Sequence, residues 1–196
     1  MAGLGAELGL PEQLFLTREK GEQAYRLLRN RLEQLPDGQG LLLTFPEGQL
    51  VDASFADETI IRLGEELLRC QSGNVALIMQ GLTEDSIKNI EAVISFRRLK
   101  LAFLAVGPTG GWQCIGQLDP ALREVLYLLA EHHQLTAPQL AELLELEINT
   151  ASTRLKRLYD RHLSWREYES LNKGLQYHYH FWQWPPELFK SNGQKA

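Results

Sequence analysis

The chain lacks several features that would place it in common functional classes. Its 196 residues contain no apolar run near the ~20 residues that span a bilayer. The first ten residues hold no lysine or arginine, whereas a secretory signal begins with a basic region. Its two cysteines, Cys70 and Cys114, belong to no CxxC or zinc-spaced cluster. These absences predict a cytoplasmic protein in a reducing compartment, without a membrane segment or a zinc site.

The motifs of catalysis and cofactor binding are missing as well. The sequence contains no Gly-rich phosphate loop, no GxSxG and no HExxH. Neither cysteine stands in a local reactive signature. We therefore expect that the protein is not an enzyme and needs no cofactor, because catalysis would require a pocket with paired titratable groups that no motif announces.

The chain also lacks an excess of positive charge. It has 20 basic and 25 acidic residues, a net charge of -5, which argues against a surface that attracts nucleic acid everywhere. Residues 119–182 hold seven basic and nine acidic residues, but the segment 148–161 holds four basic residues and one acid, Asp160. Any contact with DNA must therefore come from this local strip.

The first 116 residues alternate between apolar runs of strand length and amphipathic helical segments. This alternation predicts right-handed crossovers and a mostly parallel sheet covered by helices, in one α/β domain over residues 12–116. Ser54 is the expected N-cap of the second helix, with Asp57 completing a capping box. The expected helices begin near residues 17, 54 and 83, and the expected strands cover 40–45, 74–80, 101–106 and 112–115.

A different pattern follows residue 117. Asp119 is a possible cap for a first helix, and Thr136 with Gln139 forms a capping box for a second, short one. A third helix is expected over 148–162, and two strand-like runs, 163–168 and 175–182, flank a turn containing Asn172 and Gly174. Three helices and a hairpin in this order predict a winged helix over residues 118–184, with a polar tail at 185–196.

Two resemblances support these predictions. The segment LTAPQLAELLELEINTASTRLKRLYDRHL, residues 135–163, resembles MarR-type and related winged helix-turn-helix regulators, except that Glu145 replaces the usual turn glycine. Residues 14–107, through Leu16-Thr17-Arg18 and VDASFADE at 51–58, resemble the bacterial STAS-like domain of unknown function. The resemblances imply a DNA-binding domain and a sensing or partner-binding domain. In anti-anti-sigma STAS proteins a serine at this helix start is phosphorylated, and the matching position here is Ala53, beside Ser54.

The third helix of the C-terminal region carries the candidate DNA-binding residues. Asparagine and arginine can read adenine and guanine edges, while serine, threonine and lysine can hold phosphates. Lys173 at the hairpin tip could contact the backbone. The alternative is an ordinary solvated helix face, which the nearby Glu142, Glu145 and Glu147 support. The candidates on the helix are Asn149, Thr150, Ser152, Thr153, Arg154, Lys156 and Arg157.

The remaining candidates have simpler alternatives. Asp52, Ser54 and Asp57 could form a regulatory or partner-binding site, with phosphate favoured at a helix N-terminus, but Ser54 as a plain N-cap is the more economical interpretation. His178 and His180 could ligate a metal, although no third ligand is placed by sequence, so we expect no metal site.

The sequence thus predicts a DNA-binding transcriptional regulator that acts as a homodimer on two half-sites, with an unknown protein partner for the STAS-like domain. The runner-up is a protein-interaction module, a STAS-type regulatory switch whose winged helix does not meet DNA.

Overall fold

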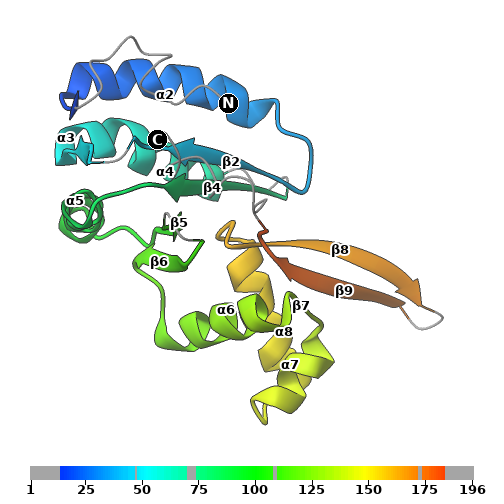
Figure 1. Cartoon of the computed structure of the whole chain (residues 1–196). Helices are drawn as coiled ribbons and strands as arrows, with labels where there is room; N and C mark the ends of the chain where they lie inside the picture. The colour runs from blue at the N-terminus through cyan, green and yellow to red at the C-terminus, as the bar shows by residue number, and fades with distance from the viewer. Residues whose placement is uncertain (1–13, 47, 70–73, 108–109, 172–173, 184–196) are drawn as a thin grey trace, which may run out of the picture.

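The computed structural model describes residues 14–46, 48–69, 74–107, 110–171 and 174–183. The protein is mixed α/β, with a parallel-rich sheet near the middle of the molecule (Figure 1). The expected strands appear with bounds shifted by a residue or two. The first part of the chain contains β1 (Leu14–Phe15), α2 (Arg18–Glu33), β2 (Gln39–Thr44), β3 (Leu50–Val51), α3 (Ala53–Ala56), η1 (Asp57–Ile61), α4 (Arg62–Arg69), β4 (Val75–Gln80), α5 (Glu84–Phe96), β5 (Ala102–Val106) and β6 (Trp112–Gly116).

The larger sheet has the strand order β2-β4-β5-β6. β2, β4 and β5 run parallel, and β6 pairs antiparallel with β5 at the edge. The expectation of a mostly parallel sheet is therefore confirmed. β1 and β3 form a separate parallel pair, with Leu14 opposite Leu50, which the sequence patterns did not predict because each strand has only two residues.

The helix that follows β3 begins two residues earlier than expected. Its N-cap is Asp52, whose Oδ1 accepts a hydrogen bond of 2.7 Å from the backbone N–H of Phe55. The prediction of Ser54 as N-cap, with Asp57 completing a capping box, is therefore wrong. Aspartate is as good a cap as serine, and starting at Asp52 places Phe55 and Ala56 in the core. The helix then runs through the π-helical turn η1 into α4.

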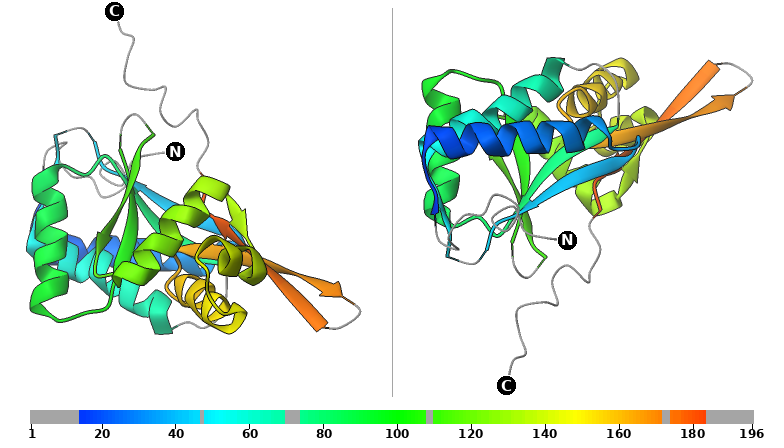
Figure 2. Two further views of the ribbon diagram at one scale, coloured as in Figure 1. Left: turned by 90° about the horizontal axis from the view of Figure 1, so that it is seen from below. Right: turned by 90° about the horizontal axis from the view of Figure 1, so that it is seen from above.

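The two faces of the sheet are covered by different parts of the chain (Figure 2). Leu43, Leu77 and Phe103 point to one face, where α2, α3, α4 and α5 pack. Ile78 and Leu104 point to the other face, where the residues after 117 pack. The alternation of side chains along a strand explains this division. Burial on both faces agrees with the nearly continuous apolar character of β4 and β5.

The described residues after 117, which are 118–171 and 174–183, form three helices and a three-stranded sheet, and we call them the C-terminal unit. The sheet has the order β7-β9-β8, and all its pairs are antiparallel. The long β8–β9 hairpin projects away from the body of the molecule (Figure 1). The elements are α6 (Pro120–His132), β7 (Gln134–Leu135), α7 (Ala137–Leu143), α8 (Ile148–Tyr159), β8 (Ser164–Leu171) and β9 (Gly174–Phe181).

One apolar core joins the C-terminal unit to the sheet. Leu122, Val125 and Leu126 of α6 belong to the same buried cluster as Leu104 and Cys114. The cluster continues through α8 to the base of the hairpin. The helices of the C-terminal unit are therefore held against the sheet as well as against one another. In the part of the chain that the structure describes, we found no helix with both the length and the apolar character needed to cross a bilayer.

Candidate nucleic-acid interface

The turn between α7 and α8 sets the direction of α8. At the start of α7, Gln139 Oε1 accepts hydrogen bonds from the backbone N–H and the hydroxyl of Thr136, at 2.8 and 2.9 Å. After α7, Glu145 adopts φ 50°, in the left-handed region that favours glycine. The backbone N–H of Leu146 then donates to the carbonyl of Ala141 at 2.9 Å. Glu145 thus takes the conformation that suits glycine, at a cost of about 1 kcal/mol.

α8 divides into a buried face and an exposed face. Ala151, Leu155 and Leu158 are fully buried, which anchors the helix in the core. The candidate DNA-binding residues all lie on the rest of the helix surface, as the sequence predicted. Ser152 and Arg154 are half-buried, and the exposed candidates are Asn149, Thr150, Thr153, Lys156 and Arg157.

The candidates on α8 differ in how far they are already engaged. Thr153 donates its hydroxyl proton to the Asn149 carbonyl at 2.8 Å, within the helix. Lys156 Nζ lies 2.6 Å from Asp160 Oδ2, and Arg154 Nη1 lies 3.9 Å from Glu124 Oε2. The Lys156–Asp160 pair is exposed and contributes little to stability, so a phosphate can replace its carboxylate.

Arg157 is the candidate most available for a ligand. Its side chain is exposed, and among the described residues it has neither an ion pair nor a side-chain hydrogen bond. The first turn of α8, with Asn149 and Thr150, is exposed as well. Amide, hydroxyl and guanidinium groups at these positions can contact both base edges and phosphates. Lys173, the candidate at the hairpin tip, lies outside the described residues.

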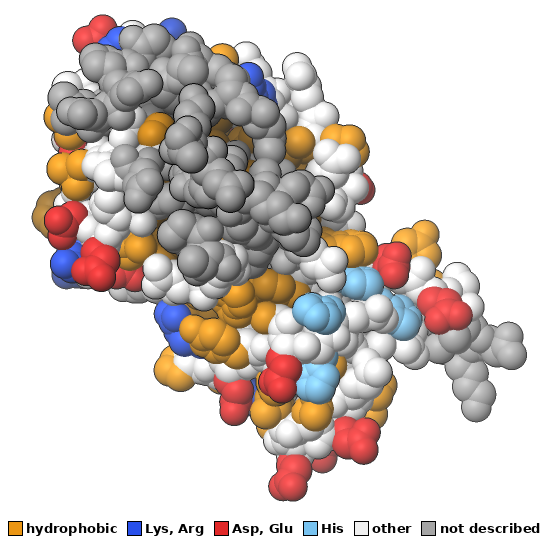
Figure 3. All heavy atoms as spheres, viewed as in Figure 1, with side chains coloured by type: hydrophobic (Ala, Val, Ile, Leu, Met, Phe, Trp, Pro, Cys, Tyr) orange, Lys and Arg blue, Asp and Glu red, His pale blue; other side chains and the backbone are white. Residues whose placement is uncertain are grey.

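One face of the hairpin carries histidines and acids. His180 Nε2 lies 3.2 Å from Glu167 Oε1, and His178 Nε2 lies 3.6 Å from Glu169 Oε2. Figure 3 shows histidine side chains beside acidic ones on this part of the surface. Burial lowers the pKa of His180, and Glu167 opposes this shift only in part. Glu167 and Glu169 therefore place negative charge on this face of the hairpin.

The opposite face of the hairpin is aromatic. Arg166 lies over the ring of Tyr159 in α8, 4.1 Å from its centroid, and over that of Tyr177, at 4.3 Å. It also donates to Tyr179 Oη at 3.3 Å. Burial opposes the charge of Arg166, but the hydrogen bond to Tyr179 and the surrounding tyrosines outweigh it and raise the pKa of the guanidinium. Toward the tip, Tyr168 is 66% exposed. This cluster connects the end of α8 to the hairpin.

The proposed regulatory residues lie away from α8. Asp52 caps its helix and Asp57 binds Arg97, with Oδ1 2.7 Å from Nη1. Ser54 is exposed beside them. Their helix packs on the opposite face of the sheet from α8, so the structure does not bring the two candidate sites together.

The remaining candidates for reactivity are the cysteine thiols and the possible metal ligands. Burial raises the pKa of the Cys114 thiol to about 11, which keeps it protonated and unreactive at neutral pH. Cys70, the other cysteine, is not among the described residues. Within the described ranges, no group of three or more histidine, cysteine, aspartate or glutamate side chains could hold a metal ion, and His178 and His180 gain no third ligand there.

Sequence reasoning missed the joint that fixes the C-terminal unit. Asn74, just before β4, donates from Nδ2 to the Arg166 carbonyl at 2.9 Å and accepts at Oδ1 from the Arg166 backbone N–H at 3.0 Å. His162 contacts backbone carbonyls of α4 and β4. A polar asparagine at the edge of an apolar run was the only local signal.

The chain matches no protein-family model, and no curated protein matches it either.

Proposed function

We propose that the C-terminal unit is a winged helix-turn-helix that binds double-stranded DNA, and that the protein is a transcriptional regulator. The observation that carries this proposal is the element order α6-β7-α7-α8-β8-β9 together with the sheet order β7-β9-β8. In that arrangement α7 and α8 are the helix-turn-helix pair and the β8–β9 hairpin is the wing. α8 is then the recognition helix that enters the major groove.

The exposed surface of α8 suits this role. Asn149 and Thr150 in the first turn would face base edges, and Arg157 would reach a base edge or a phosphate. Lys156 and Arg154 would exchange their carboxylate partners for phosphates. Such an exchange costs little for Lys156, because its pair with Asp160 is exposed to water.

The acidic residues around α8 limit how strongly the protein can bind. Glu167 and Glu169 are 62% and 64% exposed on the wing, and Glu142, Glu145 and Glu147 surround the turn before α8. Screening over about 8 Å at physiological salt weakens their repulsion of phosphate without removing it. We therefore propose a small number of phosphate contacts and a moderate affinity, rather than broad electrostatic attachment.

The N-terminal region would supply the regulation. We propose that residues 12–116 are a STAS-like domain that binds a protein partner in the cytoplasm around Asp52, Ser54 and Asp57. The exposed Ser54 hydroxyl at the helix start is accessible to a partner or a kinase. The regulator would act as a homodimer, because winged-helix proteins read paired half-sites.

Binding of the full chain to random-sequence duplex DNA, measured across a salt series, tests the proposal. Contacts with phosphates predict that the logarithm of the association constant falls linearly with the logarithm of salt concentration. A matched variant, Arg157→Gln, removes one charge at the most available position and should reduce the slope by about one. No binding at low salt would contradict the proposed function.

A second candidate function is a protein-interaction module. The observation that favours it is the wing, where the exposed Tyr168 and Leu175 lie on a hairpin that also carries Glu167 and Glu169. Exposed tyrosines are frequent anchors of protein interfaces, whereas acidic groups disfavour DNA. A pull-down in which Tyr168→Ala abolishes capture of a protein that the wild-type chain retains, with no DNA bound by either, would support this candidate.

A further inference from the structure

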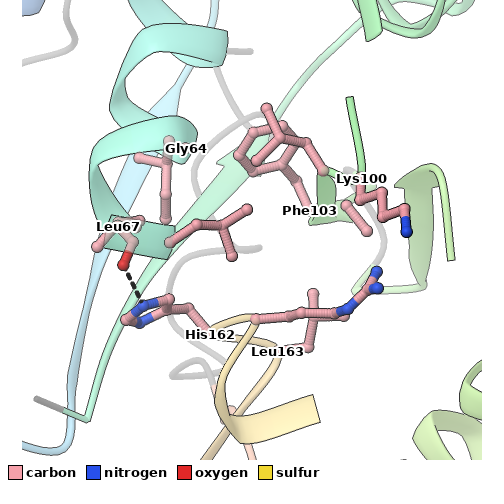
Figure 4. A pocket seen from close by; sticks show the side chains of 11 residues that line it. Gly64, Leu67, Lys100, Phe103, His162 and Leu163 are labelled. Carbon is pink, nitrogen blue, oxygen red and sulfur yellow. Dashed lines mark hydrogen bonds between the residues drawn. The ribbon is translucent and has the colours of Figure 1, made fainter. Parts of the chain in front are cut away.

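The turn that follows α8 makes an unusual pair of contacts. His162 adopts φ 58° and inserts its ring between α4 and the start of β4. Its Nδ1 lies 2.8 Å from the carbonyl oxygen of Val75, and its Nε2 lies 2.7 Å from the carbonyl oxygen of Leu67 (Figure 4 shows the second contact). Both ring nitrogens are thus at hydrogen-bond distance from backbone oxygens of the first half of the chain.

Two such contacts require two donors. A carbonyl oxygen can only accept a hydrogen bond, and a neutral imidazole carries a proton on one nitrogen only. In the neutral form, the bare nitrogen would direct its lone pair at a carbonyl lone pair from less than 3 Å. The protonated imidazolium donates at both nitrogens and satisfies both carbonyls. We propose that His162 is a proton-dependent latch, which in its doubly protonated form ties the C-terminal unit to α4 and β4.

The two carbonyls are available for this role because of where they lie. Val75 is the first residue of β4, and the pairing of β4 with β5 begins only at Ile78 opposite Leu104. Leu67 is in the last described turn of α4, where the helix dipole places partial negative charge on carbonyl oxygens. Both carbonyl oxygens can therefore accept a hydrogen bond from the ring.

Other charges near the ring are positive and act against protonation. Lys100, before β5, and Arg161 line the same pocket as His162, and Arg69 ends α4. Lys100 and Arg69 are exposed, so water screens them. Arg161 directs its guanidinium to the Gln117 carbonyl, at 3.4 Å, and toward the carboxylate of Asp119, at 3.9 Å.

The strands beside the His162 ring add little charge to its surroundings. β4 carries no charged residue. On β8, Arg166 turns into the tyrosine cluster and Glu167 contacts His180 on the other face. The carbonyl pair therefore remains the nearest electrostatic partner of the ring.

Loss of the proton would act on the position of α8. His162 follows the end of α8 by three residues, and the Asn74–Arg166 hydrogen bonds lie four residues further on. Without the second N–H, one of the two His162 hydrogen bonds is lost, and the attachment of α8 then depends on the remaining His162 hydrogen bond, the shared core and the Asn74–Arg166 hydrogen bonds. The latch would make the attachment of α8 to the sheet tighter at lower pH, whether or not the protein binds DNA.

Nitrogen-15 NMR of the histidine rings in the full chain tests the protonation state directly. The signals of His162 can be identified without altering it, by replacing His132, His133, His178 and His180 with glutamine one at a time. We expect both ring nitrogens of His162 to be protonated at the acidic end of the range in which imidazoles titrate, with hydrogen-bonded N–H signals. A ring that is neutral there, or that shows no slowed exchange of its N–H protons with water, overturns the proposal.

A second measurement compares stabilities. Urea unfolding of wild type, His162→Gln and the control His132→Gln, which alters an exposed histidine, should be followed from acidic to alkaline pH. We expect His162→Gln to lower the folding equilibrium constant on the order of tenfold to a hundredfold at acidic pH, with the difference shrinking as pH rises. The control should follow wild type. A difference that does not change with pH overturns the latch.

Discussion

α8 and the β8–β9 hairpin lie side by side in one unit, yet they offer opposite surfaces to a ligand. α8 is anchored by fully buried Leu155 and Leu158, and it exposes polar and basic groups such as Arg157. The hairpin projects from the body and exposes Tyr168 together with Glu167 (Figure 1). α8 therefore presents polar and basic side chains to a ligand, whereas the described part of the hairpin presents aromatic and acidic ones.

The arrangement of the Arg166 cluster explains how these surfaces coexist. The guanidinium lies between Tyr159 of α8 and Tyr177 of β9, so the only basic side chain described on the hairpin is taken up in a structural contact. In the described part of the hairpin, the charged side chains that face water are then Glu167 and Glu169. If the protein binds DNA, α8 must supply most of the attraction, and these two glutamates must oppose it.

The largest expected effect is a difference in the free energy of unfolding between a variant of α8 and a variant of the hairpin. Leu155→Ala would leave a cavity in the shared core and should lower the free energy of unfolding by about 2–5 kcal/mol. Tyr168→Ala, at a 66% exposed position, should cost no more than about 1 kcal/mol. Urea denaturation of both variants measures the difference, and equal losses would break the contrast between an anchored helix and a surface hairpin.

The next effect concerns DNA affinity. The double variant Arg154→Ala/Arg157→Ala should lose about 1–3 kcal/mol of binding free energy for each arginine that contacts DNA, and its salt slope should be shallower by about two. The control is Arg26→Ala, an exposed arginine of α2 in an i,i+4 pair, which should bind like wild type. Unchanged affinity and slope in the double variant would rule out α8 as the recognition helix.

Removing charges from the hairpin should raise DNA affinity, whereas removing them from α8 should lower it. Glu167→Gln/Glu169→Gln removes two negative charges and should raise affinity for DNA severalfold at low salt, with a smaller gain at high salt because screening already weakens the repulsion. Fluorescence anisotropy with a labelled duplex would measure both. If the double variant binds DNA no better, the hairpin lies too far from the duplex to matter.

A smaller effect concerns acid stability. The pKa of His180 is lowered, chiefly by burial, so the unfolded chain takes up a proton there more readily than the folded one. The contribution of His180 to stability should therefore fall as pH drops through the ordinary histidine pKa. His180→Phe keeps a ring against Trp165, whose centroid is 4.0 Å away, and removes the titration. Its melting temperature should decline less with acidification than that of wild type or of His132→Phe.

The predictability of this molecule depends on how local each signal is. A helix was predicted to begin near residue 83, and Thr83 is the N-cap of α5, where its Oγ1 accepts from the Ser86 backbone N–H at 3.2 Å. The apolar runs of β4 and β5 likewise predicted a parallel sheet. These features follow from a few neighbouring residues. Ser54 was mistaken for a cap because Asp52, two residues earlier, is an equally good N-cap residue and also accepts from Thr17 N–H at 3.4 Å.

The features that could not be predicted depend on distant contacts. Nothing local indicates that His162 would meet Leu67, 95 residues earlier, or that Asn74 would pair with the backbone of Arg166. The exposed face of α8 was predicted from helical spacing, because the buried positions of one helix fix its outer face. The aromatic cluster around Arg166 was not predicted, because its side chains come from α8 and from both strands of the hairpin.

The most direct test of the account is the salt dependence of DNA binding by the wild-type chain, measured beside the Arg154→Ala/Arg157→Ala variant on the same random-sequence duplex. The account predicts binding at low salt that weakens linearly on a double-logarithmic plot, with the variant weaker and its slope shallower. Binding absent at low salt, or identical lines for the two proteins, would contradict the assignment of α8 as a DNA-binding helix.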